Sequence, residues 1–488
     1  MLSTKISWKE WMLVLLAFAP LLFINVSASH DWGDDFAQYI LQAKCIVEGK
    51  AQTTYAIYDS QFYYVLGPPT RPIGLPLLLT PFYYFFGNNM FVFSCLMSVC
   101  YYLIALLVFR YLREAVSFLP ALLWTCTMLY NPQFLQLKLA VLSDFPFMIL
   151  LMLFFKVIKK PASSYQIILL SVLAGLLICF RLIGVVILPV YVIYWITNQS
   201  SQKTFLSFAK QPLLFIASSL AIFFTLNFIL LSNNSESWNA YSFISGLIDY
   251  QHLLSTIHYY TFIYTLIYEQ EIWGFANIIQ KSFMLVIVGL GFIISLRKKL
   301  KAEDWFVIIY LAAMFFYPSN STAIRFLMPV FPMLLLYQIE GLKSIQLPSY
   351  KLNKLKIYLV PLIILLSYSI NLKNIFYQQG KIQEGPYEKS VVEAFDYINS
   401  TLPKNEMYAF TKHHAFMLYT DRRCIPARDN LSLSELKIFT NKYHVKYLLY
   451  VADVSGENIL ELVQSELHYK LIWKNKSCKI FEREYVSN

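Results

Sequence analysis

The sequence predicts an all-α polytopic membrane domain with about eleven transmembrane helices, followed by a small C-terminal α/β domain. Of its 488 residues, 57% are hydrophobic and 14% are charged, whereas soluble domains average roughly 45–50% apolar and 25% charged residues. The apolar residues lie in blocks of roughly 16–25 residues, the length that crosses a bilayer core. Beyond residue 371 the composition becomes that of a soluble protein. We therefore expect a transmembrane domain at 1–371 and an extracytoplasmic domain at 372–488.

The distribution of charge predicts which loops face the cytoplasm. The net charge is +11, but the basic residues lie in short loops between apolar blocks, which is typical of topology signals and not of nucleic-acid binding. If the N-terminus is cytoplasmic, every second loop is too, and these loops hold the basic runs at 156–160 and 297–301. The first long loop (29–75), an aromatic loop (233–278) and the C-terminal domain are then extracytoplasmic.

Apolar blocks give the individual elements of the membrane domain. A membrane-dipping helix is expected after Pro72, ending at Gly87. Full spans are expected at about 11–28, 88–109, 115–131, 140–157, 165–180, 182–197, 211–232, 280–296, 304–317, 324–341 and 355–371.

The C-terminal domain shows helical and strand patterns. Apolar residues at helical spacing predict a helix at 387–400, and buried strands are expected at 407–410 and 445–451. Two more strands are expected within 469–481. Cys424 and Cys478 could form a disulfide if this region is extracytoplasmic.

An acidic cluster follows the first span, in the stretch from His30 to Tyr39. Acids beside a membrane are costly unless water, a cation or a substrate satisfies them. Asp34 and Asp35 are adjacent and point in different directions, so one could act as a base while the other binds a metal or fixes the loop. Alternatively, the acids cap the helix that follows, at 36–47, where negative charge is favourable.

Three other residues of this cluster are candidates for supporting roles. Asp31 is a competing or supporting acid, and Trp32 and Tyr39 provide aromatic surface on which a sugar ring could stack. These residues make the first loop the predicted reactive centre.

Three arginines at predicted extracytoplasmic positions could bind phosphate. Arg71 lies in a Pro- and Gly-rich turn, and Arg181 and Arg325 lie at the non-cytoplasmic ends of spans, against the positive-inside trend. Guanidinium groups bind phosphate bidentately; the alternative is that these side chains snorkel to the headgroups as interfacial anchors. Asp144 could be a supporting carboxylate near Asp34, or could cap its own helix with Ser143.

In this order and sidedness, the motifs resemble the C-type (GT-C) integral membrane glycosyltransferases, most closely the bacterial branch related to protein O-mannosyltransferases and lipid A aminoarabinose transferases. The resemblance covers most of 1–371 and, more loosely, the C-terminal domain. It rests on the acid pair and the Arg71 turn together with Ser143-Asp144-Phe145-Pro146, Gly175…Arg181…Gly184…Pro189 and Arg325-Phe326-Leu327-Met328-Pro329.

The resemblance implies a donor sugar on a polyprenyl phosphate and inverting transfer on the extracytoplasmic face. Asp34 matches the loop acid of the family and would be the general base. Arg71, Arg325 or a divalent metal ion, with Asp35 as one ligand, would stabilise the charge of the leaving phosphate. The family often has Asp-Glu where this chain has Asp34-Asp35. The implied acceptor is a glycolipid, a polysaccharide or a protein, and the implied location is a bacterial inner membrane.

Two other classes of function fit parts of the sequence. A transporter usually places its ionisable residues at mid-membrane on broken helices, whereas these acids and arginines lie toward one face. A flippase for a lipid-linked sugar would also use arginines but would not need the acid pair. An envelope-assembly protein is compatible with the large C-terminal domain.

Overall fold

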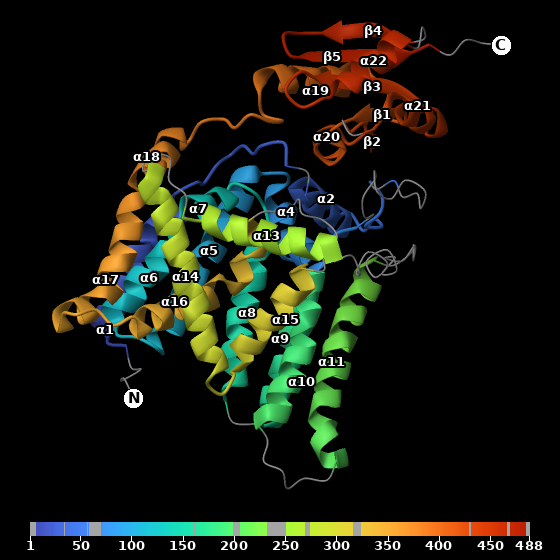
Figure 1. Ribbon diagram of the computed structural model, residues 1–488. Helices are drawn as coiled ribbons and strands as arrows, with labels where there is room; N and C mark the ends of the chain where they lie inside the picture. The colour runs from blue at the N-terminus through green and yellow to red at the C-terminus, as the bar shows by residue number, and fades with distance from the viewer. Residues whose placement is uncertain are drawn as a thin grey trace. The chain divides into compact units, whose positions relative to one another are not determined.

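The computed structural model describes most of the chain and shows two compact units (Figure 1). The helical unit comprises Met1–Val26, Cys95–Ile229 and Ser237–Gln379, and the sheet unit comprises Ser27–Ser94, Leu230–Glu236 and Gly380–Asn488. The described residues are 6–33, 35–55, 57, 70–160, 163–198, 205–231, 250–268, 274–315, 324–428, 431–465 and 469–484.

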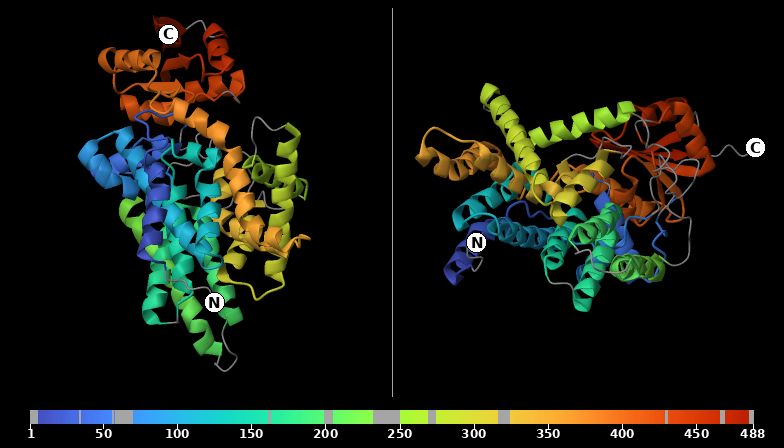
Figure 2. Two further views of the ribbon diagram at one scale, coloured as in Figure 1. Left: turned by 90° about the vertical axis from the view of Figure 1, so that its left-hand side faces the viewer. Right: turned by 60° about the horizontal axis from the view of Figure 1, so that its bottom comes forward.

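The helical unit is built almost entirely of apolar helices. α8, α9, α10 and α15 run roughly alongside one another (Figures 1 and 2). The helices are α1 (Trp8–Phe18), η1 (Ala19–Leu22), α5 (Met90–Arg113, from Cys95 onward), α6 (Phe118–Leu129), α7 (Pro132–Leu137), α8 (Asp144–Ile158), α9 (Ser164–Phe180), η3 (Leu182–Val186), α10 (Ile187–Asn198), α11 (Phe205–Leu231), α13 (Tyr250–Leu266), α14 (Gly274–Leu296), α15 (Ala302–Phe315), η4 (Ile324–Phe326), η5 (Met328–Val330), α16 (Phe331–Ser344), α17 (Tyr350–Ser367) and α18 (Ser369–Gln378).

Three helices within the described residues are long and apolar enough to cross a membrane, at Met90–Arg113, Ala209–Phe228 and Asn277–Leu296. The pair α17 and α18, bent by 42°, would be a fourth span if it crosses as one. Several other predicted spans form shorter apolar helices, and residues 118–129 are an example. The membrane-spanning character is therefore supported, whereas the predicted number of about eleven spans is not established.

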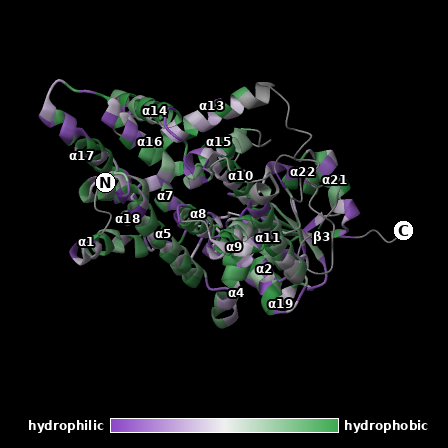
Figure 3. Ribbon diagram, turned by 90° about the horizontal axis from the view of Figure 1, so that it is seen from below, coloured by the Kyte–Doolittle hydropathy of each residue, from purple (hydrophilic) through white to green (hydrophobic). Residues whose placement is uncertain are grey.

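Large apolar side chains lie exposed on the outer helices, as expected of surfaces that face lipid. On α14, Ile278, Phe283 and Val286 are exposed, and on α17, Ile363 and Leu366 are exposed. Hydrophobic residues predominate along the helices of this unit in Figure 3. Large exposed apolar surfaces on a protein are typical of contact with a membrane or a partner.

α14 and α16 cross at unusually close range because each has a glycine at the contact. A Cβ on Gly291 would collide with the backbone carbonyl of Tyr337, and a Cβ on Gly341 would collide with that of Ile287. Small residues allow helix backbones to approach closely where no hydrophobic effect drives helices together. The two glycines therefore determine how these helices pack.

A buried amide ties three segments of the helical unit together. Asn131, fully buried, caps α7 and donates from Nδ2 to the carbonyl of Ile267 at 2.7 Å and to the Tyr368 hydroxyl at 2.9 Å. Tyr368 in turn donates to the carbonyl of Thr127 at 3.1 Å. Because unsatisfied polar groups are costly in an apolar interior, these bonds fix the mutual positions of their segments.

The sheet unit contains a five-stranded mixed sheet in the order β2-β1-β3-β5-β4. β1 lies parallel to β2 and β3, and β5 lies antiparallel to β3 and β4. Its elements are α2 (Asp35–Val47), α4 (Gly74–Phe86), α19 (Lys389–Thr401), β1 (Met407–Phe410), α20 (His413–Thr420), β2 (Cys424–Pro426), α21 (Leu433–Lys442), β3 (Val445–Val451), α22 (Glu457–Ser465), β4 (Tyr469–Lys474) and β5 (Cys478–Arg483).

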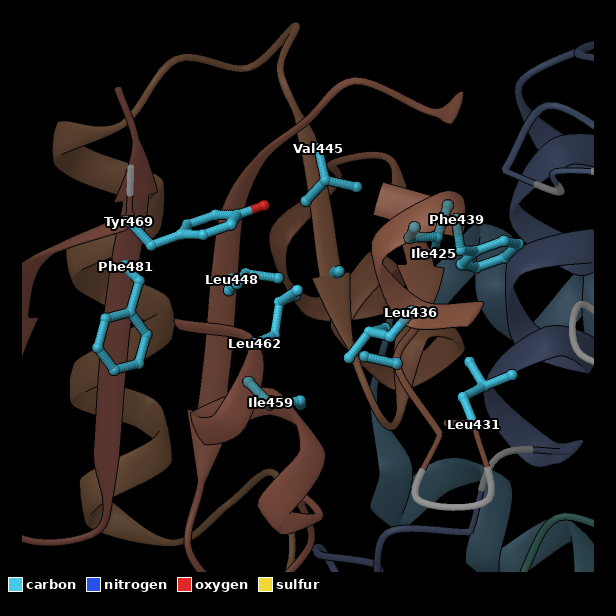
Figure 4. Packing of buried hydrophobic residues seen from close by; sticks show 12 residues of the cluster. Ile425, Leu431, Leu436, Phe439, Val445, Leu448, Ile459, Leu462, Tyr469 and Phe481 are labelled. Atoms are coloured by element: carbon cyan, nitrogen blue, oxygen red, sulfur yellow. The ribbon is translucent and has the colours of Figure 1, made fainter. Parts of the chain in front are cut away.

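Helices cover both faces of this sheet. α21 and α22 contribute Leu436, Phe439 and Leu462 to a core that includes Leu448 of β3 and Phe481 of β5 (Figure 4). Alternate residues of the strands face the other side, where Tyr408 of β1 contacts Phe416 of α20 at 5.1 Å between ring centroids. The mostly helical fold with a small C-terminal sheet is thus confirmed.

The C-terminal predictions agree closely with the structure. The strands predicted at 407–410 and 445–451 are β1 and β3, and the helix predicted at 387–400 is α19. The two strands expected within 469–481 are β4 and β5. The sequence reading missed β2, which has three residues and includes Pro426, too short for a periodic pattern. Cys424 and Cys478 are not joined: β2 and β5 are separated by two intervening strands, about 14 Å at strand spacing, beyond disulfide reach.

The first loop belongs to the same compact unit as the C-terminal sheet, although composition alone groups it with the helices. Its apolar part forms α4, which ends at Gly87 with φ of 60°. At 13 residues, α4 would extend only about 20 Å. Tyr84 and Phe85 at its end are exposed. The short apolar helix is thus confirmed, and its dipping into a membrane stays a prediction.

Candidate functional site

One face of α2 holds Arg71 in place. Asp35, Gln38 and Gln42 lie on this face because they are spaced three and four residues apart along the helix. Asp35 accepts a hydrogen bond from Nη2 of Arg71 at 2.6 Å, and Gln38 accepts one from Nε at 2.8 Å. Gln42 accepts from the Arg71 backbone N–H at 2.8 Å and donates to its carbonyl at 3.1 Å. Asp35 of the acidic cluster and Arg71 of the Pro- and Gly-rich turn are therefore directly paired.

This pair is half-buried, since 28% of the Asp35 side chain and 30% of the Arg71 side chain are exposed. Asp35 also occupies the first turn of α2, where a negative charge is favourable. Its carboxylate thus stabilises the N-terminus of α2 and also pairs with Arg71. Asp34, the predicted general base, lies outside the described residues.

The side chain of His30 is almost completely buried, with 1% exposed. Its Nε2 lies 2.5 Å from the Tyr419 hydroxyl, its Nδ1 lies 2.5 Å from the carbonyl of Asp31, and its ring packs on Phe36. Burial lowers the pKa of His30 to about 4, although the contact with Asp31 opposes this shift. His30 is therefore neutral at physiological pH and connects the first loop to α20.

The other predicted side chains of the cluster have defined surroundings. The Asp31 carboxylate accepts a hydrogen bond from the backbone N–H of Gly33 at 2.8 Å, and Asp31 is exposed. Trp32 is 9% exposed and meets Phe410 of β1 edge to face at 5.5 Å. Tyr39, within α2, is 7% exposed. The two aromatic rings thus pack within the unit, and their stacking on a sugar stays a prediction.

Sequence reasoning missed Asp421, which receives two hydrogen bonds from the first loop. Its carboxylate accepts from Lys44 of α2 at 2.7 Å and from the Tyr55 hydroxyl at 2.6 Å. Burial would raise the pKa of Asp421, but these two donors outweigh burial and hold it below its usual value. Asp421 ends α20 with φ of 56°, a left-handed conformation that only Gly, Asn and Asp readily adopt. No sequence pattern pairs positions so far apart in the chain.

A second cluster lies within the helical unit, around the Phe326 ring. Arg181 forms an ion pair with Asp144, and its guanidinium lies over Phe326 at 4.7 Å. The guanidinium of Arg325 lies over the same ring at 5.6 Å. Tyr310 of α15 donates to the carbonyl of Phe326 at 2.9 Å and so fixes this segment. Stacking on an aromatic face is favourable for guanidinium groups.

Local sequence explains why these groups meet. Asp144 is the first residue of α8, and Arg181 ends α9 in an extended conformation (φ −149°, ψ 128°) before η3 begins. Gly184 in η3 is needed because a Cβ there would collide with the backbone of Leu177. Asp144 is 1% exposed, so its charge is tolerated only because Arg181 balances it.

The structure therefore groups the predicted residues into two sets. Asp31, Asp35 and Arg71 belong to the sheet unit, and Asp144, Arg181 and Arg325 belong to the helical unit. Among the residues that the structure describes, no group of three or more His, Cys, Asp or Glu side chains could hold a metal ion. Asp35 as a metal ligand stays a prediction.

No protein-family model matches the chain, and no curated protein sequence matches it. Solved structures do. ArnT from Cupriavidus metallidurans bound to undecaprenyl phosphate matches with a TM-score of 0.59 and 12% identity, covering 97% of this chain and 98% of ArnT. The oligosaccharyltransferase AglB from Archaeoglobus fulgidus, in complex with an inhibitory peptide and a dolichol-phosphate, matches with a TM-score of 0.56 and 12% identity, covering 95% of this chain and 72% of AglB.

A third similar structure is the arabinofuranosyltransferase AftD from Mycobacteria, with a TM-score of 0.57 and 9% identity. It covers 98% of this chain and 42% of AftD. All three are GT-C glycosyltransferases. The chain therefore has the GT-C fold, and the resemblance noted in the sequence is confirmed at the level of the fold.

Proposed function

We propose that this protein is an integral membrane glycosyltransferase that moves a sugar from a polyprenyl-phosphate donor to an acceptor hydroxyl. The observation that carries this proposal is the likeness of fold along nearly the whole length of both this chain and ArnT. The ArnT structure contains undecaprenyl phosphate and the AglB structure contains a dolichol-phosphate, so proteins of this fold bind polyprenyl phosphates.

We propose Asp34 as the general base. It takes the proton of the acceptor hydroxyl while that oxygen attacks the anomeric carbon from the face opposite the phosphate. The bond between the anomeric carbon and the phosphate oxygen breaks, and its electron pair leaves on polyprenyl phosphate, so the configuration inverts. The engagement of Asp35 with Arg71 at 2.6 Å supports this division, because Asp35 is already used in holding the loop.

The Phe326 cluster is the better supported candidate for binding the donor phosphate. Arg181 and Arg325 both lie on the Phe326 ring, and Asp144 orients Arg181. Such preorganised guanidinium groups stabilise the charge that develops on a leaving phosphate. Arg71 is paired with Asp35 as Arg181 is with Asp144, but it belongs to the same unit as the loop acids, so we assign it chiefly to positioning them.

The proposal also includes the membrane, the orientation of the chain and the class of acceptor. The reaction takes place on the extracytoplasmic face of a bacterial inner membrane, with a cytoplasmic N-terminus and an acceptor that is a glycolipid, a polysaccharide or a protein. A divalent ion, with Asp35 as one ligand, would assist the leaving phosphate. A flippase for a lipid-linked sugar is the alternative, since it too would bind the donor phosphate.

The test is a turnover assay with purified protein in one detergent and a panel of polyprenyl-phosphate sugars. We expect wild type to release polyprenyl phosphate from one donor and Asp34→Asn to bind that donor without releasing it. The matched control is Asp396→Asn, an exposed acid on α19, which should retain wild-type turnover. Turnover in Asp34→Asn at the wild-type rate would remove Asp34 as the base. Donor binding with no turnover by wild type, in the presence of an envelope extract as the source of acceptor, would favour the flippase.

A further inference from the structure

Two helices of the helical unit end side by side in a basic hollow that the proposed reaction does not use. The hollow lies between the last turns of α5 and α8. It is lined by Leu107, Arg110, Tyr111, Glu114, Met152, Phe155, Lys156 and Lys159. Arg110 and Lys156 are exposed, whereas Tyr111 and Phe155 are buried beneath them. Three of the four charged residues that line the hollow are therefore cations, with Glu114 the one acid, and its base is aromatic.

The surface that leads to this hollow is apolar on both helices. On α5, Val99 and Leu103 are exposed, Leu107 is half-exposed, and Arg110 follows on the same face. These positions are spaced four, four and three residues apart, so they form one stripe along the helix.

α8 repeats the pattern. Ile149 and Leu153 are half-exposed, and Lys156 follows on the same face, again at spacings of four and three residues. Each helix therefore presents an apolar stripe that ends in one cation. A phospholipid has a complementary arrangement along its length, because its apolar acyl chains are followed by a negatively charged phosphate.

The charges around the hollow are unequally balanced. Lys159 is engaged, since its Nζ lies 2.8 Å from Glu114 and 2.7 Å from Glu303 and over the Tyr111 ring at 5.3 Å. Within the described part of the chain, neither Arg110 nor Lys156 has a carboxylate within ion-pair distance. Arg110 also lies near enough to Lys156 to repel its charge. Two like charges held together at the end of an apolar surface favour an anion between them.

We propose that this hollow binds the phosphate of an anionic membrane phospholipid, whose acyl chains lie along the stripes on α5 and α8. Arg110 and Lys156 contact the phosphate, and the engaged Lys159 with Tyr111 forms the wall behind it. Basic pockets between transmembrane helices are recognised sites for anionic headgroups. The proposal does not depend on the sugar-transfer reaction, because it uses none of the residues assigned to that reaction.

The test is native mass spectrometry of the full-length protein in detergent, titrated with phosphatidylglycerol or with phosphatidylcholine of the same acyl chains. We expect wild type to retain one phosphatidylglycerol in preference to phosphatidylcholine. In Arg110→Gln/Lys156→Gln the affinity for phosphatidylglycerol should fall at least about tenfold, given roughly 1 kcal/mol for each basic residue at a lipid surface. The matched control is Lys351→Gln/Lys354→Gln, which removes two exposed cations from the first turns of α17.

Charge is separated from folding by the conservative variant Arg110→Lys/Lys156→Arg, which should bind phosphatidylglycerol like wild type. Equal losses in the Arg110/Lys156 and Lys351/Lys354 variants would overturn the proposal, because the effect would then be general attraction to basic surface. Equal retention of the two lipids by wild type would also overturn it. Displacement of phosphatidylglycerol by inorganic phosphate at matched concentration would identify a site for free anions instead of a lipid.

Discussion

Single charged residues in this protein are tolerated where a partner of opposite charge is built in. Asp144 is 1% exposed and pairs with Arg181, whose side chain is 11% exposed. Asp35 and Arg71 are similarly paired but less buried. Removing one member of a buried pair leaves an uncompensated charge, and this costs far more than removing both. The two pairs therefore differ in what they contribute to stability.

The Asp144–Arg181 pair leads to a prediction for unfolding. Asp144→Asn or Arg181→Gln alone should lower the free energy of unfolding, by roughly 3–5 kcal/mol for the change that strands the buried carboxylate. The double substitution should cost clearly less than the sum of the two. Thermal unfolding in detergent measures this cycle. The control is Lys298→Gln, which removes an exposed partner of Glu340 and should shift the midpoint little. Additive losses at positions 144 and 181 would contradict the pairing.

His30 leads to a prediction for pH dependence. Its pKa is lowered from 6.5 to about 4 in the folded protein, so the unfolded chain binds more protons between these values. Stability is therefore full above pH 6.5 and falls as the pH drops toward 4, by roughly 3 kcal/mol in total. Thermal midpoints at pH 7 and pH 5 measure the loss. We expect a smaller loss in His30→Gln than in wild type, and an unchanged one in His258→Gln, which alters an exposed histidine of α13. Identical pH dependence in His30→Gln and wild type would contradict the assignment.

At the scale of elements, close contacts of backbone determine how the helices pack. α14 meets α16 at Gly291 and Gly341, where no side chain fits, whereas a Cβ on Gly289 would meet nothing within 4 Å. Two glycines in one helix, two residues apart, therefore have opposite requirements. The sequence around Gly289 and Gly291 does not show which of the two must be glycine. That depends on the position of α16, which lies against Gly291 alone.

This contrast predicts opposite results for one kind of substitution. Gly291→Ala should lower the free energy of unfolding by roughly 1–3 kcal/mol, because the added methyl forces the helices apart. Gly289→Ala should be neutral or stabilising by up to about 1 kcal/mol, since alanine is the better helix former. Thermal unfolding of the two variants under the same conditions tests both. Similar midpoints for the two alanine variants would exclude the close crossing.

At the scale of the whole molecule, the chain is not divided as its composition suggests. The first loop with α2 and α4 belongs with the C-terminal sheet in one compact unit. Trp32 meets Phe410, His30 meets Tyr419, and Lys44 meets Asp421. The segment that holds Asp31 and Asp35 is thus supported by a domain that lies more than three hundred residues further along the chain.

Weakening the contact between the first loop and Asp421 should make α2 less stable locally. Asp421→Asn keeps a residue that tolerates the left-handed conformation but removes the charge that Lys44 and Tyr55 contact. We expect amide hydrogen exchange within α2 to become roughly two- to five-fold faster, the effect of losing a partly exposed ion pair. Asp453→Asn, at an exposed turn after β3, should leave α2 exchange unchanged. Unaltered α2 exchange in Asp421→Asn would show that other contacts hold the loop.

Features that depend on local pattern could be predicted from the amino-acid sequence. Apolar blocks predicted the helices, β-branched and aromatic runs predicted β1 and β3 at their observed bounds, and the ordered motifs indicated the GT-C fold. These predictions succeed because hydrophobic periodicity and composition can be recognised within a few helical turns or a single strand. The short strand β2, with three residues that include Pro426, was beyond that range.

The tertiary structure alone decided which charges meet. The sequence marked Arg71, Arg181 and Arg325 as similar candidates for binding phosphate, but the structure pairs Arg71 with Asp35 and Arg181 with Asp144, and places Arg325 on Phe326. It also decided that Trp32 packs on Phe410 and that Asp421 supports the first loop. The physical reason is that ion pairs and ring contacts depend on distance in space, and residues separated by tens to hundreds of positions have no periodic signal that links them.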